Sequence, residues 1–306
     1  MKKTLIALTI ASMAAGVNAA ELYNQNGNTL NLSGRAEAVV SHQDATATRG
    51  DFEDQSRVRL NVAGTTQIND ALYAVGVWEG EFVTADKSAI DTRYGFAGIG
   101  GEFGLVTYGK NDGSLGMITD FTDIMSWHGA GAGQKLSVAD RTENNLGYVG
   151  NFAALTVKAN YRFDDATAGQ TSTDGFSIGA KYALGNSGFA LGAGMASESS
   201  VEQYMLGAGY ELNNLYFGAL ATSKTFDNSN DYFGYELAAQ YTLDKTVLTG
   251  TYANGEFDND TDASVDQIAL EAAYFFKPNF RGYTSYNFNM VDGQDDELIL
   301  GLRYDY

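Results

Sequence analysis

The sequence predicts an all-β protein, a 16-stranded antiparallel transmembrane β-barrel with an inward-folded third external loop. Three observations lead to this prediction. Residues 28–306 alternate between apolar and polar with a period of two, the pattern of strands with a different environment on each face. The connections alternate strictly between short and long. Proline is nearly absent, while glycine (36 residues) and aromatic residues (12%) are plentiful, a mixture that suits many paired strands.

The first residues have the pattern of an export signal. Two lysines precede an apolar run at residues 5–10, and small residues follow as far as Ala19. A membrane anchor is excluded because this run is well short of the roughly 20 residues that a helix needs to span lipid. We therefore predict a signal peptide at residues 1–19 that is cleaved after Ala19, and a barrel at residues 20–306.

Composition excludes several classes of function. The formal net charge is −19 and becomes −21 without the two lysines of the leader. Such a chain is expected to repel nucleic acid and to concentrate cations. There is no cysteine, which excludes disulfides, thiolate catalysis and cysteine-bound metal. No linker or shift in composition divides the chain, so we expect one domain.

The strands and their connections define the topology. Alternation is clearest at residues 155–163, 176–184, 204–212, 233–243 and 268–276. Short connections are predicted at residues 69–70, 102, 151–152, 185–188, 213–214, 244–245 and 278–279. Seven short and eight long connections join sixteen antiparallel strands, with both termini at the short-turn end. This is the layout of an outer-membrane barrel.

A soluble all-β protein would also have alternating strands. Here, however, Tyr and Phe lie near the strand ends, as Tyr204 and Tyr210 do, and interfacial girdles require this placement. The opposite face is too polar for a dry core: Arg281, Ser285 and Asn287 on one strand would each cost kilocalories if buried without water. We therefore expect an aqueous lumen. The chain ends in an aromatic residue, as do barrels recognised by the barrel assembly machinery.

The longest interruption of the two-residue alternation lies at residues 111–140. This stretch is too apolar for a solvated loop, and it carries Asp120 and Asp123 without a nearby base. Its large apolar residues are Leu115, Met117, Ile118, Phe121, Ile124, Met125 and Trp127. We expect the stretch to fold into the barrel and to act as a constriction loop.

Four motifs, in order and at matching spacing, carry a resemblance to a known family. They are residues 55–60 (QSRVRL), 91–98 (DTRYGFAG), 107–111 (TYGKN) and 121–125 (FTDIM). The chain resembles the Gram-negative general diffusion porins over its whole length after the leader. It is most similar to the OmpU/OmpL type of marine gammaproteobacteria. The resemblance implies a homotrimer of 16-stranded barrels, in which acids of the third loop face a ladder of basic residues.

The resemblance also supplies the predicted pore constriction. The basic ladder maps onto Arg35, Arg59, Arg93 and Arg141, and the loop acid onto Asp123; residue parity allows all four arginines to point inward. Arg57 shares that parity, and Glu79 corresponds to the family's acid beside a strand tryptophan. The family's second loop acid is replaced near Trp127 and His128. Asp120 supplies the missing negative charge if it lies one helical turn from Asp123.

The predicted function is that of an outer-membrane porin for passive diffusion of ions and small hydrophilic solutes. Loop acids predict a weak preference for cations. Two other interpretations are a substrate-specific oligosaccharide channel and an adhesin-like structural barrel. Expected partners are outer-membrane lipid, lipopolysaccharide and the assembly machinery. Loose divalent-cation binding by acidic loops, bridging lipopolysaccharide phosphates, stays open.

We expect neither enzyme activity nor a cofactor. Ser126 and His128 are two residues apart and do not form a nucleophile and base pair. The glycine-rich stretches do not have dinucleotide-binding spacing and follow no βαβ pattern. The acidic run at residues 258–262 departs from a calcium-binding EF-hand loop at its sixth and twelfth positions. No metal site is predicted.

Overall fold

The computed structural model describes residues 19–44, 50–85, 90–129, 131–164, 173–227, 230–259 and 264–306. The predicted signal peptide lies almost wholly outside these residues. Among the described residues, the helices are the short α2 (Gly116–Thr119) and the 3-10 turn η1 (Ser137–Ala139), and no helix has the length and apolar character to cross a membrane.

The rest of the described chain is dominated by β-structure. The strands are β1 (Ala20–Gln25), β2 (Asn28–His42), β3 (Phe52–Asp54), β4 (Arg57–Gln67), β5 (Leu72–Val83), β6 (Asp91–Gly101), β7 (Gly104–Asp112), β8 (Arg141–Phe152), β9 (Leu155–Arg162), β10 (Gly175–Ala183), β11 (Phe189–Glu198), β12 (Val201–Leu212), β13 (Leu215–Thr225), β14 (Tyr232–Leu243), β15 (Thr246–Phe257), β16 (Val265–Lys277), β17 (Phe280–Asn289) and β18 (Glu297–Asp305).

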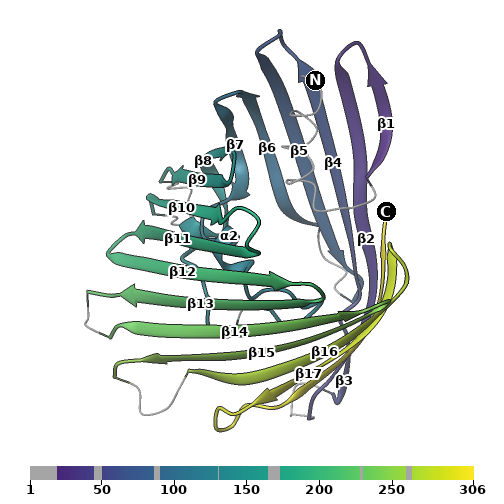
Figure 1. The fold of residues 1–306 in the computed structure, drawn as a ribbon, viewed down its shortest axis with the longest axis vertical. Coiled ribbons are helices and arrows are strands. Elements are labelled where there is room, and N and C mark those ends of the chain that lie inside the picture. Colours follow the sequence, from purple (N-terminus) through teal and green to yellow (C-terminus); the bar gives the residue numbers. More distant parts are fainter. Residues whose placement is uncertain are drawn as a thin grey trace.

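The strands form one closed antiparallel sheet in chain order (Figure 1). Each strand from β4 to β17 pairs with the next, and β18 pairs with β2 to close the barrel. β3 and β4 both pair with β2 and together make one wall strand, which is interrupted at Gln55 and Ser56. The wall therefore has sixteen strands, and the predicted barrel is confirmed.

The prediction omits one strand. β1 forms a hairpin with the first residues of β2, so strand structure begins at Ala20 rather than at Asn28. The turn is Asn26–Gly27, with φ of 54° and 77°, and Asn-Gly is the typical sequence for a tight hairpin turn with two positive φ values. β18 pairs with β2 further along the same edge. Gly34 and Tyr306 exchange backbone hydrogen bonds of 2.8 and 3.0 Å there.

The turn between β8 and β9 is also displaced from its predicted place. Asn151 and Phe152 remain paired with β9, and the turn is formed by Ala153 and Ala154. Ala153 has φ 53°, which few non-glycine residues adopt. The alternating pattern gives no sign of this, because an alanine pair carries no turn signature.

The two faces of the wall have reversed polarity compared with a soluble protein. On β12, the apolar side chain of Leu206 is 63% exposed, while the polar side chain of Gln203 is fully buried. Leu191, Leu237 and Leu270 on neighbouring strands are likewise exposed outward. An apolar exterior around a polar interior is the arrangement that lipid requires of a β-barrel.

Residues 113–140, hereafter the inner loop, pack against the inward face of β10 to β13. Their apolar residues form a buried cluster with the wall: Leu115, Met117, Ile118, Phe121, Val138 and Ala139 with Ala196, Met205 and Leu220. Glycines of the wall make room for the loop. A Cβ atom at Gly207 would lie 2.5 Å from a ring carbon of Phe121, and one at Gly194 would lie 2.6 Å from Leu115.

This packing predicts a face-specific effect of substitutions on β12. We expect Gly207→Val to lower the free energy of unfolding by about 1–3 kcal/mol, because the added side chain overlaps Phe121 in a filled interior. The neighbouring Ala208→Val points to lipid and is the control, with an expected change near zero. Equilibrium unfolding in detergent measures both variants, and equal stabilities would contradict the proposed docking of Phe121 on this face.

Candidate functional site

The inner loop follows the inside of the wall from β10 round to β18. Beyond Phe121 it is held by hydrogen bonds and, at its tip, by packing of Trp127 against a buried apolar cluster of β2, β16, β17 and β18. The Ser126 N–H donates to both carboxylate oxygens of Glu271 on β16, each at 2.9 Å. The ring of His128 bridges Ser285 of β17, at 2.6 Å, and Glu297 of β18, at 3.1 Å.

The returning half of the loop is held by acceptors of the wall in reverse strand order. Glu236 of β14, only 2% exposed, accepts the N–H groups of Ala132 (2.8 Å) and Gly133 (2.6 Å) and the hydroxyl of Thr122. Gln203 of β12 then accepts the Leu136 N–H at 2.8 Å. Glu198 of β11 follows, accepting from the hydroxyl of Ser137 and the N–H of Val138. Each carboxylate thus satisfies backbone donors that would otherwise be buried unpaired.

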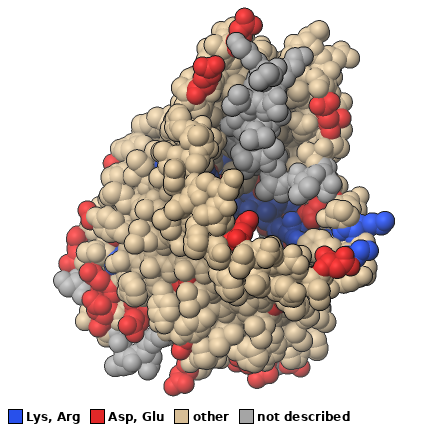
Figure 2. Space-filling model, viewed as in Figure 1, with Lys and Arg blue, Asp and Glu red and all other residues tan. Residues whose placement is uncertain are grey.

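A cavity of about 620 Å³ lies between the inner loop and the wall around β2 to β10. Figure 2 shows Lys and Arg gathered in the hollow of this face. The charged residues that line it are Arg35, Arg59, Glu79, Arg93, Asp112, Asp120, Lys158, Lys181, Arg303 and Asp305. The cavity therefore has charged walls of both signs.

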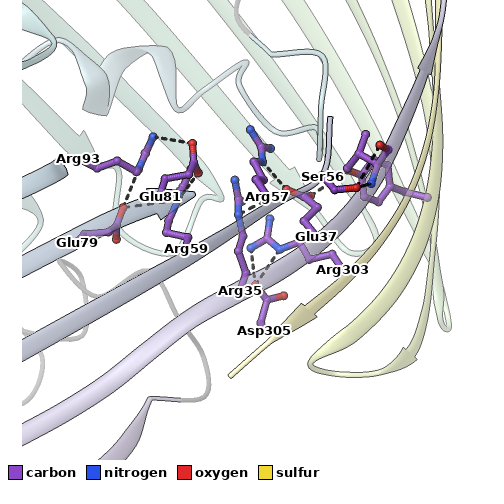
Figure 3. Close-up of polar contacts among 12 residues, drawn as sticks. Arg35, Glu37, Ser56, Arg57, Arg59, Glu79, Glu81, Arg93, Arg303 and Asp305 are labelled. Atoms are coloured by element: carbon purple, nitrogen blue, oxygen red, sulfur yellow. Dashed lines mark hydrogen bonds and ion pairs between the residues drawn. The ribbon is translucent and has the colours of Figure 1, made fainter. Parts of the chain in front are cut away.

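Most of these arginines are paired with acids of their own wall (Figure 3). Nε of Arg93 donates to Glu79 at 2.8 Å. Arg59 donates to Glu81 at 2.5 and 2.8 Å. Charge-assisted hydrogen bonds of this kind fix the guanidinium groups in place. The acids also offset much of the positive charge that a bare arginine ladder would present.

Comparison with known proteins agrees with this geometry. The family model for the Gram-negative porins matches residues 7–294 of the chain. This chain belongs to the Gram-negative porin family. It is 49% identical to outer membrane protein U of Vibrio parahaemolyticus and 41% identical to porin-like protein L of Photobacterium profundum, with full coverage of both chains in each comparison.

A solved structure shares the porin fold. The structure of Salmonella typhi OmpF in complex with daunomycin matches with a TM-score of 0.81 and 21% sequence identity, covering 94% of this chain and all of that one. Family membership places the chain in the outer membrane and makes it a porin. The predicted family and location are therefore confirmed.

Five of the eight predicted constriction residues line the porin's cavity. They are Arg35, Arg59, Glu79, Arg93 and Asp120. Arg57 lies beside them, with its guanidinium 4.8 Å from the ring centre of Trp127 at the tip of the inner loop. Asp123 is exposed on the loop, next to Gly129.

Arg141 lies next to the cavity lining. It does not line the cavity, and its guanidinium lies 5.4 Å from the ring centre of Tyr94, which does. The inward alternation of β8 changes between Thr142 and Asn145, both of which are buried, and Asn144 between them has φ 52°. Because of this irregularity, residue parity alone does not specify the direction of the Arg141 side chain.

Sequence reasoning misses several charged residues of the site. Glu37 lies two residues after Arg35, and Glu81 lies two residues after Glu79. Because residues two apart on a strand share a face, this spacing could have identified both acids. Alternation places Lys158 on a polar face. Lys181, Arg303 and Asp305 carry no comparable motif.

Asp120 is the acid that the inner loop presents to the cavity. Its side chain keeps exposed surface, but the surrounding protein still removes part of its hydration, and this desolvation raises the pKa of its carboxyl above the usual value, against the opposing effect of Lys158 and Lys181. Asp123 and Asp112 raise the pKa further by repulsion. Asp120 therefore takes up a proton at a higher pH than an ordinary aspartate.

This shift predicts a pH-dependent selectivity. Asp120 is negative above its raised pKa and neutral below it, so acidification should reduce cation permeability relative to anion permeability, starting above the usual carboxyl value of about 3.9. Reversal potentials in a salt gradient, measured between neutral and acidic pH, test this. Asp120→Asn should flatten the profile in that range, whereas Asp70→Asn in a short turn should not. A wild-type profile identical to that of Asp120→Asn would refute the role of Asp120.

Proposed function

We propose that this porin allows passive diffusion of ions and small hydrophilic solutes, with a weak preference for cations. The observation that carries the proposal is the cavity bounded by the inner loop on one side and by Arg35, Arg59 and Arg93 on the other. A polar passage of this kind admits solutes that keep their hydration or replace it with contacts to the wall. Lipophilic solutes would displace ordered water from the passage, so they are disfavoured.

Charges on opposite sides of the cavity favour small polar solutes. Asp120 faces the cavity from the loop, and the arginines face it from the wall. Because Glu79 and Glu81 neutralise part of the arginine charge, we infer a transverse field weaker than four unpaired arginines would give. Dipolar solutes align in such a field without being held strongly.

Cation preference follows from the balance of charge along the whole path. The cavity lining carries both signs, so it discriminates little between ions. The chain as a whole carries a formal charge of −19, and Figure 2 shows Asp and Glu along the edge where the long connections lie. Acids near the pore entrances raise the local concentration of cations over a Debye length.

Planar-bilayer recordings test this function. We expect large, steady conductance steps and a reversal potential that favours cations. The preference should be stronger at about 0.1 M salt, where the Debye length is about 10 Å, than at about 1 M, where it is about 3 Å. Equal permeability to sodium and chloride at the lower salt would refute cation selectivity. Absence of conductance would favour a structural barrel, and block by one sugar at micromolar levels a substrate-specific channel.

We further propose that the porin is a homotrimer that is assembled by the barrel assembly machinery and surrounded by lipopolysaccharide. The outward face of β2 and β5 supports a subunit contact, because small residues there, Ala36, Ala38, Ala74 and Gly76, allow close approach of two barrels. On β12 and β14, by contrast, Tyr and Phe project to lipid.

A bulky residue on β5 should dissociate the trimer. Gly76 is exposed, and an added Cβ there would meet no atom within 4 Å, so the barrel itself leaves room for an outward side chain at this position. We expect monomers on a native gel. Ala219→Trp on the outward face of β13 is the control and should migrate as the wild type does. Unchanged migration of Gly76→Trp would contradict this placement of the contact.

A further inference from the structure

We propose that the inner wall formed by β17, β18, β2 and β4 holds a binding site for a small divalent oxyanion, such as inorganic phosphate or a dicarboxylate. The site is an arginine patch that consists of Arg35, Arg57, Arg281 and Arg303. It lies beside the proposed passage and deepens the proposed function by naming a solute class. Arg281 and Arg303 are not among the predicted constriction residues.

Strand register brings like charges together in this patch. Arg281 of β17 lies directly opposite Arg303 of β18. On the other side of the β18–β2 pairing that closes the barrel, Arg35 of β2 lies directly opposite Arg59 of β4. Like charges at directly opposed positions of a sheet are destabilising. The same register places Glu37 opposite Arg303 and Asp305 opposite Arg35. Arg281, which faces Phe275 and Arg303, is therefore the member without a directly opposed negative charge.

The acids of the wall supply only part of that charge. Glu37 is shared by Arg57, at 2.7 Å, and Arg35, at 3.6 Å, while Arg303 contacts Asp305 at 2.6 Å. Figure 3 shows Arg35, Arg57 and Arg303 converging around Glu37 from neighbouring strands. Three of the four guanidinium groups thus share two carboxylates in direct contact.

Arg281 is the least satisfied member of the patch. Among the described residues it has no ion pair within 4 Å, and its contact is with the ring of Phe275, 5.3 Å from the guanidinium carbon. The nearest further acid along the wall, Glu271, already accepts two hydrogen bonds from the inner loop. Nε atoms of both Arg35 and Arg281 are buried without a hydrogen-bond partner in the described part of the chain.

This surplus of donors defines the ligand. Guanidinium groups bind planar carboxylates and tetrahedral phosphates through paired N–H groups. A divalent anion would offset the repulsion between Arg281 and Arg303, whereas a monovalent one would offset half as much charge. The patch borders the charged cavity that Arg35 and Arg303 also line, which favours a hydrophilic anion.

Fluorescence of the purified protein in detergent tests this site. Trp127 lies under the guanidinium of Arg57, so an anion bound in the patch should change its emission. Trp78→Phe removes the other of the two tryptophans and isolates this signal. At constant ionic strength we expect a saturable response to inorganic phosphate or succinate, and little response to acetate.

The decisive variant is Arg281→Gln, which leaves no carboxylate without its ion pair. We expect its apparent affinity to fall roughly tenfold, as for the loss of one charge-assisted hydrogen bond. Lys245→Gln, in a short turn, removes the same charge elsewhere and should leave the affinity unchanged. Equal affinities in wild type and Arg281→Gln, or a response to acetate equal to that to phosphate, would overturn the proposal.

This measurement separates the binding site from the proposed conductance. Binding is read in detergent and conductance in a bilayer. Conducting channels without saturable binding refute the oxyanion site alone. Saturable binding in a protein that gives no conductance refutes the diffusion function alone.

Discussion

Attachment of the inner loop to the wall is the interaction on which the pore depends. A barrel with a wet lumen has no central core, so a loop inside it must obtain its contacts from the wall. Here the attachment uses two kinds of force in sequence: apolar packing of Phe121 and its neighbours at β10 to β13, then hydrogen bonds to Glu271, Glu236 and Glu198. Apolar packing excludes water over a compact area. Charge-assisted bonds hold backbone donors over the longer path, where apolar contact is confined to Trp127 at the tip and to Val138 and Ala139 at the end of the loop.

The same wall carries the charges of the passage, and this creates a conflict. Arginines that face a lumen repel one another when they stand on adjacent strands. Acids two residues along the same strand, or directly across from it, reduce this repulsion, as Glu81 does opposite Arg59. The consequence is a rigid, nearly balanced lining in which selectivity depends on the charges left over. Arg281 and Asp120 are two such groups.

The sequence predicted the barrel, its strand number, most short turns and the inward position of the loop residues, because period-two alternation and a long apolar interruption are local signals. It failed where the chain departs from regular alternation. The irregularity at Asn144 interrupts the alternation of β8 close to Arg141, and the turn at Ala153 lacked the usual turn residues. The β1 hairpin could have been predicted from the Asn26–Gly27 turn sequence. Pairs such as Arg281 with Arg303 depend on register between strands, which alternation within one strand does not specify.

The loop tip and the arginine patch occupy two levels of the same strands. On β17, Ser285 contacts His128 of the tip, and Arg281 stands four residues closer to the short turn. At about 3.3 Å per residue this is roughly 13 Å along the strand. Glu297 and Arg303 of β18 repeat the same order. Trp127 under Arg57 joins the two levels, so the arginine patch and the tip of the loop share a direct contact.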